Sequence, residues 1–310
     1  MRTLAVVMSA PGHAALEPLD LTAPGDADVV VDVAWSGISA GTERLLWSGR
    51  MPDFPGMGYP LVPGYESVGR IVQAGAASGR TAGEMVFVPG ARCFGAVRGL
   101  FGGAAARLVT GGARVAPIAN DLGDRGTLLA LAATAHHAVG QQAPDLVVGH
   151  GVLGRLIARI TIALGHPAPV VWEALADRSA GADGYVVTTA AQDAGRSYRC
   201  IVDASGDAGL LDGLIARLAP GGEVVLAGFY AGALSFSFPP AFMREARLRC
   251  AAEWKPDDLA VVQRLIAERL LSLDGLITHR RPAAAAQDAY HTAFNDIGCL
   301  KMILDWSASA

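Results

Sequence analysis

Three glycines at fixed spacing in the middle of the chain could bind a dinucleotide. Gly149, Gly151 and Gly154 follow an apolar run and precede an apolar segment with helical periodicity. In a strand–turn–helix unit, the first glycine allows the tight turn, the second admits a pyrophosphate and the third lets helix and strand pack closely. Because free N–H groups gather at a helix N-terminus, we expect Val152 and Leu153 to present backbone amides to the phosphates.

The glycine spacing alone is a weak signal, because a chain with 38 glycines among 310 residues will contain it by chance. An acidic residue about 20 positions later, after a second strand, strengthens the prediction. Residues 168–172 predict that strand, and Glu173 ends it. A carboxylate there can bind both ribose hydroxyls of NAD and would repel the 2′-phosphate of NADP. Arg178 nearby favours NADP instead, and the alternative for Glu173 is a solvated loop acid.

Two further positions in the nucleotide-binding region could take part in the chemistry. Ser205 follows the strand predicted at 198–203, at the edge where the nicotinamide half would lie. His136 and His137 lie on a helix predicted over 128–140, and neighbouring helical residues point in different directions, so at most one faces a cleft. We predict His137 as a base or proton shuttle, since histidine titrates near neutrality; the alternative is a structural histidine.

Composition and charge exclude several classes of protein. The net charge of -4 gives no basic footprint for nucleic acid. No uninterrupted apolar run reaches the ~18 residues that would span a membrane. The cysteines are far apart, at positions 93, 200, 250 and 299, which argues against a structural zinc lobe or a disulfide framework. The sequence therefore predicts a soluble, cytoplasmic enzyme-sized protein.

The order of predicted elements divides the chain into two domains. Short strands punctuated by glycine fill the first third, as at 28–35, 67–72 and 84–89. From about residue 121 strands alternate with helices, predicted at 128–140, 209–218 and 257–271, which is typical of a doubly wound parallel sheet. Short strands at 276–281 and 300–306 close the chain. We therefore predict an α/β protein in which a Rossmann domain, residues 121–272, is inserted into a β-rich catalytic domain, residues 1–120 and 273–310.

The motif order resembles that of the medium-chain dehydrogenase/reductase superfamily over essentially the whole chain. The matching pieces are Ser36-Gly37-Ile38-Ser39-Ala40-Gly41-Thr42-Glu43, Pro63-Gly64-Tyr65-Glu66-Ser67-Val68-Gly69, the glycine turn and the tail 276–306. This resemblance implies that the β-rich domain is a GroES-like catalytic domain. Zinc-dependent members have a cysteine where Ser39 stands and a histidine where Tyr65 stands. Because hydroxyl and phenol are poor zinc ligands, the resemblance implies no catalytic zinc.

Among zinc-free members, these motifs together with residues 133–138 and 149–155 resemble the bacteriochlorophyllide a dehydrogenase family. The resemblance implies oxidation of a 3-(1-hydroxyethyl) group on a bacteriochlorin to a 3-acetyl group, with NAD as hydride acceptor. A tetrapyrrole would need an apolar lining, for which the candidates are Trp35, Trp47, Met51, Phe54, Met57, Tyr59, Phe94 and Phe101. The candidates to meet its carboxylate are Arg44, Arg50 and Arg92. A homodimer paired through the nucleotide-domain sheet is the superfamily expectation.

Without zinc, side chains must hold the alcohol oxygen and take up its proton. Tyr65 matches the former metal site, and its phenol could hydrogen-bond the developing alkoxide; the alternative is an aromatic ring that fills the vacated pocket. Thr42 matches the hydroxyl residue that relays protons in zinc relatives, and Ser39 lies close to it in sequence. The alternative for Ser39 and Thr42 is a turn that caps the following helix.

Two other functions stay open at this point. A zinc-free, NADPH-dependent reductase of quinones or enones would use the same fold and the same empty metal site. A catalytically silent binding protein that kept the fold is the third hypothesis. The preferred nicotinamide cofactor separates the first two, and hydride transfer by the protein separates both from the third.

Overall fold

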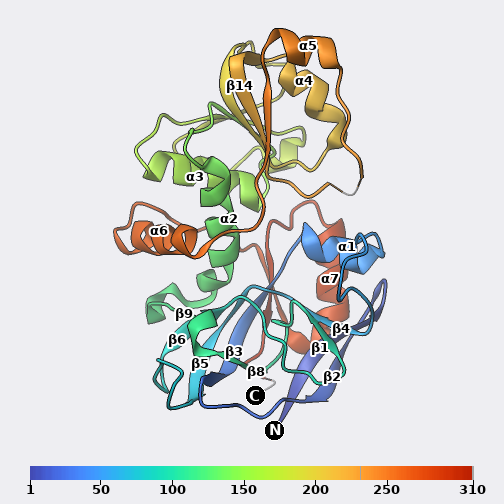
Figure 1. Ribbon diagram of the computed structural model, residues 1–310, viewed down its shortest axis with the longest axis vertical. Helices are drawn as coiled ribbons and strands as arrows, with labels where there is room; N and C mark the ends of the chain where they lie inside the picture. The colour runs from blue at the N-terminus through green and yellow to red at the C-terminus, as the bar shows by residue number, and fades with distance from the viewer. Residues whose placement is uncertain (231, 309–310) are drawn as a thin grey trace. The chain divides into compact units, whose positions relative to one another are not determined.

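The structure is a computed structural model that describes residues 1–230 and 232–308, and these form two compact units (Figure 1). Unit 1 combines residues 1–130 with 276–310, and unit 2 spans residues 131–275. Unit 1 is rich in β-strands, whereas unit 2 alternates strands and helices. The predicted fold class, a Rossmann sheet inserted into a β-rich catalytic domain, is confirmed.

Unit 1 is built from two β-sheets. The strands of the first are ordered β2-β1-β4-β7, with bounds β1 (Arg2–Ala10), β2 (His13–Asp20), β4 (Leu61–Pro63) and β7 (Arg98–Leu100). The second is ordered β16-β17-β3-β5-β6-β9, and β8 also pairs with β3. Its bounds are β3 (Asp28–Ile38), β5 (Ser67–Ala74), β6 (Met85–Val88), β8 (Arg107–Gly111), β9 (Ala116–Pro117), β16 (His279–Pro282) and β17 (Met302–Asp305). The helices are α1 (Thr42–Ser48) and α7 (Ala286–Asn295), with short 3-10 turns at 112–114, 120–128 and 283–285.

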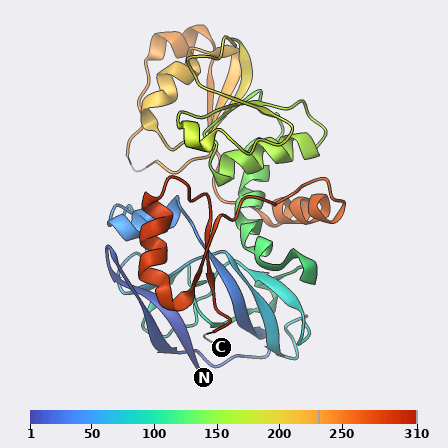
Figure 2. The same cartoon turned by 180° about the vertical axis from the view of Figure 1, so that it is seen from behind.

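The end of the chain completes the sheet that carries the Ser39 motif. Strand β17 runs antiparallel to β3 and places Met302 opposite Ile38. Helix α7 lies against β2, β16 and β17 (Figure 2). It buries Tyr290 and Phe294 in the core of unit 1, which also contains Trp306. Residues from both ends of the sequence therefore share one core, and they can meet at one site.

Unit 2 contains one parallel sheet of six strands in the order β12-β11-β10-β13-β14-β15. The bounds are β10 (Leu146–Val148), β11 (Val170–Trp172), β12 (Val186–Thr188), β13 (Tyr198–Asp203), β14 (Leu218–Leu226) and β15 (Arg247–Cys250). The helices are α2 (Leu129–Val139), α3 (Val152–Ala163), α4 (Leu211–Ile215), α5 (Phe238–Met243) and α6 (Pro256–Ala267), with 3-10 turns at 176–178 and 208–210. Strand order reverses between β10 and β13, and ligands of such sheets bind at the carboxyl ends of the strands there.

The structure differs from the predicted elements at several boundaries. The 3-10 segment Asn120–Leu128 packs on β3, β5 and β6, so the first boundary between the units falls near residue 131 rather than 121. Helix α6 ends at Ala267 rather than residue 271, and Arg269 just beyond it has a left-handed φ of 58°. The helix predicted over 209–218 is short, because β14 already begins at Leu218. Helix α5 and strand β15 were not predicted.

Candidate active site

The glycine turn has the geometry that dinucleotide binding requires. Gly149 adopts a left-handed φ of 97°, which favours glycine. A Cβ at Gly154 would lie 1.8 Å from the carbonyl oxygen of Gly149, so only glycine lets α3 approach the turn this closely. A Cβ at Gly151 would meet nothing within 4 Å, and no side chain caps the helix that Val152 and Leu153 begin. The N-terminus of α3 is therefore open to an anion.

Glu173 lies directly after β11 and is tied to the glycine turn. One carboxylate oxygen accepts the backbone N–H of His150 at 3.1 Å, and the other accepts the N–H of Leu175 at 2.8 Å. Arg178 ends the 3-10 turn that follows, and its carbonyl oxygen accepts a hydrogen bond from the His150 ring at 2.7 Å. The His150 ring therefore bonds to the loop after Glu173.

Ser205 lies at the carboxyl end of β13, beside the glycine turn. A Cβ at Gly149 would lie 3.2 Å from the Cα of Ser205. The Ser205 N–H and hydroxyl both donate to one carboxylate oxygen of the buried Asp203, at 2.9 and 2.6 Å. The phenol of Tyr230 donates to the other oxygen at 2.6 Å. The sequence had not predicted that Asp203 anchors this edge of the sheet.

In unit 1 the structure brings Ser39, Thr42 and Tyr65 together. The hydroxyl oxygens of Ser39 and Tyr65 are 2.6 Å apart, and those of Thr42 and Tyr65 are 3.5 Å apart. Ser39 is buried just after β3, Thr42 begins α1, and Tyr65 lies half-buried between β4 and β5. Burial, and next the Glu66 carboxylate, raise the pKa of Tyr65 above its ordinary value. The phenol therefore stays protonated at neutral pH and can donate a hydrogen bond.

Glu43 is buried beneath this hydroxyl cluster, where it joins distant parts of unit 1. One carboxylate oxygen accepts the backbone N–H of Ser39 at 3.0 Å, and the other accepts the phenol of Tyr290 at 2.6 Å. Burial raises the pKa of Glu43 to about 7, although the two hydrogen bonds oppose the shift. Tyr290 lies 247 positions later in the chain, and the sequence had not identified it.

Glu66, which follows Tyr65 in the chain, is already paired. Its carboxylate and the ammonium of Lys301 form an ion pair in which the side chains are 0% and 2% exposed. Burial raises the pKa of Glu66, and Lys301 opposes that shift. A Cβ at Gly37 would collide with the Glu66 carboxylate and lie 3.0 Å from the Cε of Lys301, so glycine makes room for the pair.

The residues at the former metal site do not fit a zinc ion. They offer a hydroxyl at Ser39, a protonated phenol at Tyr65 and a carboxylate that already has the Lys301 cation. Zinc in proteins prefers thiolate, imidazole or free carboxylate ligands. Among residues 1–230 and 232–308, no group of three or more histidine, cysteine, aspartate or glutamate side chains is placed to hold a metal.

His137, predicted as a base, lies in unit 2 beside a carboxylate. The Nδ1 atoms of His136 and His137 are 2.7 and 3.0 Å from the two oxygens of Asp258. We expected the two rings to point in different directions, but both reach one carboxylate, since Asp258 in the first turn of α6 lies within reach of both. Asp258 also accepts the backbone N–H of Lys255 at 2.8 Å.

Some of the residues predicted to line a tetrapyrrole site lie in the core, and others lie at the surface. Phe94 is 4% exposed and packs in the core of unit 1. Trp47 stacks on Tyr290, with ring centroids 5.6 Å apart. Phe101 is 37% exposed and packs edge-on against Tyr65, with ring centroids 5.6 Å apart. Phe101 is therefore the aromatic residue of that group that contacts the hydroxyl cluster directly.

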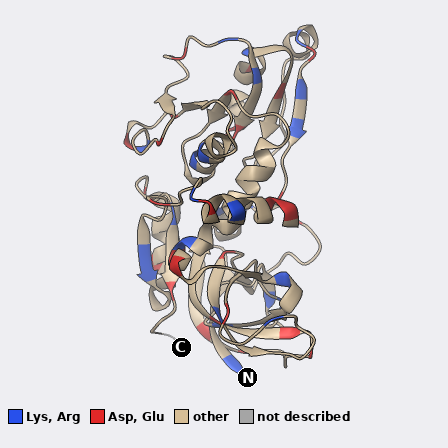
Figure 3. Ribbon diagram, turned by 90° about the vertical axis from the view of Figure 1, so that its left-hand side faces the viewer, with Lys and Arg blue, Asp and Glu red and all other residues tan. Residues whose placement is uncertain are grey.

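The distribution of charge agrees with the near-neutral composition. Basic and acidic segments are interspersed over both units in the view of Figure 3. The described part of the chain contains no helix that is long and apolar enough to cross a membrane.

A family model and two solved structures support the fold described above. Residues 25–121 match the alcohol dehydrogenase GroES-like domain family. The Bacillus subtilis 2R,3R-butanediol dehydrogenase structure superposes with a TM-score of 0.84 at 17% identity, over 98% of this chain and 99% of that chain. An Escherichia coli alcohol dehydrogenase complexed with NADH gives a TM-score of 0.83 at 20% identity, over the same shares. These matches show that the chain has the fold of these alcohol dehydrogenases, with a GroES-like domain at residues 25–121.

Two curated relatives narrow the class. The chain is 57% identical to the 2-desacetyl-2-hydroxyethyl bacteriochlorophyllide A dehydrogenase of Rhodobacter capsulatus, over 99% of both chains. It is 55% identical to the protein of the same name from Cereibacter sphaeroides, over 100% of both. The chain belongs to this bacteriochlorophyllide dehydrogenase family, as its motifs predicted.

Proposed function

We propose that the protein oxidises the 3-(1-hydroxyethyl) group of a bacteriochlorophyllide to a 3-acetyl group, with NAD as the hydride acceptor, in bacteriochlorophyll a biosynthesis. The observation that carries this proposal is the Ser39–Tyr65 hydroxyl pair, 2.6 Å apart, at the two positions where the family resemblance expects a cysteine and a histidine in zinc-dependent members. The names of the two relatives, at 57% and 55% identity over nearly the whole chain, support the tetrapyrrole substrate.

The glycine turn and Glu173 are the residues that would hold the dinucleotide. When bound, NAD supplies the electrophilic ring that accepts the hydride. The open N-terminus of α3, with Gly151, Val152 and Leu153, would bind the pyrophosphate through backbone amides. The Glu173 carboxylate, held by two backbone N–H groups, would accept the ribose hydroxyls and repel a 2′-phosphate. Ser205 would contact the nicotinamide half.

The hydroxyl cluster would hold the alcohol oxygen while the bond to hydrogen breaks. Oxidation of a secondary alcohol removes a hydride from carbon and a proton from oxygen, so negative charge develops on that oxygen. Tyr65, which stays protonated, would donate a hydrogen bond to it. The alcohol proton would pass to the Tyr65 oxygen as the phenol proton passes to the Ser39 hydroxyl, 2.6 Å away, or the Thr42 hydroxyl, 3.5 Å away. Water would accept the proton that this hydroxyl releases in turn.

We propose His137 as a proton acceptor in unit 2. Its Nδ1 faces Asp258, and a carboxylate on one ring nitrogen leaves the other nitrogen free to accept a proton. Because His136 shares the same carboxylate, comparing His137→Gln with His136→Gln separates the base from its neighbour. A drop in kcat with His137→Gln alone supports this role, whereas equal losses in both variants contradict it.

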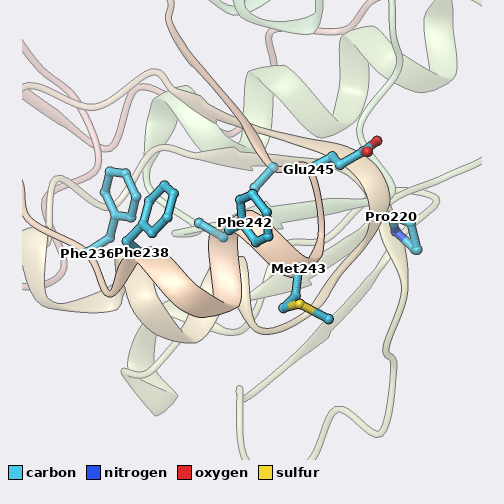
Figure 4. Close-up of a pocket in the computed structure, with 8 residues that line it drawn as sticks. Pro220, Phe236, Phe238, Phe242, Met243 and Glu245 are labelled. Atoms are coloured by element: carbon cyan, nitrogen blue, oxygen red, sulfur yellow. The ribbon is translucent and has the colours of Figure 1, made fainter.

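A second copy of the chain is the proposed protein partner. Strand β15 ends the parallel sheet, so one side of its backbone is unpaired within the unit. Shortly before β15 in the chain, α5 and the residues that precede it expose an apolar surface made of Phe236, Phe238, Phe242 and Met243, which are 42–75% exposed (Figure 4). A twofold axis would pair two identical edges and cover both surfaces at once.

The free thiols of all four cysteines support a reducing, cytoplasmic location.

The main test uses the purified protein with a 3-(1-hydroxyethyl) bacteriochlorophyllide and NAD. We expect the long-wavelength band of the pigment to shift as the acetyl group forms, with one NADH produced per acetyl group. No shift with NAD or NADP would overturn the substrate assignment. Reduction of quinones or enones with NADPH, together with no pigment oxidation, would favour the reductase hypothesis instead. Absence of hydride transfer to any acceptor would favour a silent binding protein.

A further inference from the structure

A buried arginine lies in the first turn of α3, directly after the third glycine. Arg155 is 5% exposed. Its Nε donates to the carbonyl oxygen of His150 at 3.0 Å, within the glycine turn. Its two terminal nitrogens donate to carbonyl oxygens of the β11–β12 loop: Gly181 at 3.1 Å, Arg178 at 3.0 Å and Ala180 at 2.7 Å. One guanidinium therefore joins the glycine turn to this loop.

The ring of His150 makes a second connection between the same two segments. Its Nδ1 lies 2.7 Å from the carbonyl oxygen of Arg178, and its Nε2 lies 2.8 Å from the hydroxyl of Tyr185. Because a carbonyl oxygen can only accept, Nδ1 carries the proton, and Nε2 accepts from the tyrosine. Burial lowers the pKa of His150, which keeps the ring neutral in this tautomer.

The β11–β12 loop depends on these polar contacts because it has little else to hold it. Residues 173–185 contain one 3-10 turn, at 176–178, in place of the helix that usually crosses between parallel strands. Most of the loop is exposed, although Tyr185 is buried. Gly181 has a left-handed φ of 82°, and a Cβ there would lie 2.5 Å from a terminal nitrogen of Arg155. Glycine at this position therefore lets the guanidinium reach the loop.

The charge of Arg155 also bears on ligand binding. Each of its four hydrogen bonds ends on a main-chain carbonyl oxygen, so none of them neutralises the positive charge with a carboxylate. The charge lies in the first turn of α3, where the helix dipole is positive as well. A pyrophosphate at this N-terminus would relieve the unfavourable proximity of like charges.

We propose that Arg155 is a positioning residue for the adenosine half of the dinucleotide. It holds the loop that follows Glu173 against the glycine turn, and its charge favours the pyrophosphate. The adenosine ribose site therefore keeps its shape without the usual crossover helix. This inference rests on the proposed dinucleotide site.

ADP-ribose, which lacks the nicotinamide, is the probe for this role. Calorimetric titration measures the Kd for ADP-ribose in the full-length parent protein, in three single variants and in one double variant. Arg155→Lys keeps the charge but loses the planar fork, and Gly181→Ala pushes on the guanidinium from the loop. Gly165→Ala is the matched control, because Gly165 has nearly the same φ, 83°, and a Cβ there would meet nothing within 4 Å.

We expect the Kd for ADP-ribose to rise about tenfold or more in Arg155→Lys and Gly181→Ala, as for lost hydrogen bonds to a charged group, and to stay near the parent value in Gly165→Ala. The KM for NAD should rise while kcat at saturating NAD is retained, which a general loss of folded protein would not produce. The double variant should bind about as tightly as Arg155→Lys alone, because the shorter lysine no longer meets the new methyl group.

Four results distinguish failure of this role from failure of the proposed function. An unchanged Kd in Arg155→Lys overturns the role of Arg155, and so do additive effects in the double variant. Equal losses in Gly181→Ala and Gly165→Ala assign the effect to backbone strain, which also overturns it. If the parent protein binds neither ADP-ribose nor NAD, the dinucleotide site itself is wrong.

Discussion

The hydroxyl oxygens of Ser39 and Tyr65 lie 2.6 Å apart, although 26 positions separate the residues in sequence. The segment after β3 supplies one hydroxyl, and the segment between β4 and β5 supplies the other. Glu43 fixes the backbone of Ser39 from below, and Phe101 packs against the ring of Tyr65. The pair is therefore held from both sides.

Tyr65→Phe should lower kcat by about 10²-fold or more, because in the proposed mechanism the phenol hydrogen-bonds the alcohol oxygen as that oxygen loses its proton and gains negative charge. The Kd for NAD should stay unchanged, since the dinucleotide contacts belong to unit 2. Steady-state oxidation of the hydroxyethyl pigment and titration with NAD measure the two quantities. Tyr198→Phe is the control, because it removes a buried phenol, bonded to Asp193, from the amino end of β13 in unit 2. Full activity in Tyr65→Phe would remove Tyr65 from the mechanism.

Glu43→Gln should flatten the dependence of stability on pH. The folded-state pKa of Glu43 is raised from 4.5 to about 7, so the folded protein prefers the protonated form. Its contribution to stability is full below pH 4.5 and is lost as the pH rises through about 7. The shift corresponds to ~3 kcal/mol, which glutamine, with no charge, should not lose.

Thermal or urea unfolding between about pH 5 and about pH 8 measures this effect. Parent and Glu43→Gln curves should diverge as the pH rises, with the variant relatively more stable at the alkaline end. Glu268→Gln, which alters an exposed carboxylate, should follow the parent curve. Parallel curves for the parent and Glu43→Gln would show that Glu43 does not titrate in this range.

The parts of the site that depend on local sequence were predictable. Contacts between segments that are far apart in the sequence were not. The turn from Gly149 to Gly154 could be predicted from the spacing of its glycines, because the steric requirement for glycine arises within the turn itself. The approach of Tyr65 to Ser39 followed from the resemblance to a known family. The contact between Glu43 and Tyr290 has no local signal, because two segments 247 positions apart create it.

The fold shows the same division between local and distant causes. The order of strands and helices in unit 2 followed from the alternating pattern, and the β-rich character of unit 1 followed from its short strands. Helix α5 could not be predicted from the sequence, because Pro239 and Pro240 lie in its first turn and its residues are all apolar, without an alternation of polar and apolar faces. The sequence pattern predicts a boundary at residue 121, whereas the two units divide near residue 131. Residues 120–128 pack on unit 1, and the sequence pattern does not show this packing.

Activity should favour NAD over NADP, and Glu173→Gln should weaken that preference. A neutral amide no longer repels the 2′-phosphate and binds the ribose hydroxyls less strongly than a carboxylate. We expect the KM for NAD to rise about tenfold and the KM for NADP to fall. Asp177→Asn, which removes an exposed acid from the same loop, controls for the general change in charge and should have a smaller effect. Preference of the parent protein for NADP would refute the assignment of Glu173.

Treatment with a strong chelator should leave activity intact, and metal analysis should find far less than one zinc per chain. The physical reason is the ligand set, in which Lys301 already neutralises Glu66 and the other two positions carry hydroxyl groups. Activity before and after dialysis against the chelator, with elemental analysis of both samples, measures this. Loss of activity that added zinc restores would contradict the metal-free site.

Phe242→Glu should convert the proposed dimer to monomers. Phe242 is 64% exposed on α5, which shortly precedes the edge strand β15 in the chain, and a twofold axis through the proposed interface would bring two copies of the new carboxylate together. Buried charges without partners are costly, so the dimer should dissociate at concentrations where the parent remains paired. Light scattering coupled to size-exclusion chromatography measures the mass.

The other edge of the same sheet provides the control for this experiment. Val186 on β12 is 67% exposed, so Val186→Glu places an equal charge on an equally exposed apolar position at the opposite edge. If β15 and α5 form the interface, this variant should stay dimeric while Phe242→Glu does not. A monomeric parent protein would refute the dimer. Dissociation by Val186→Glu alone would move the interface to β12, because only the edge that faces the partner is sensitive to a buried charge.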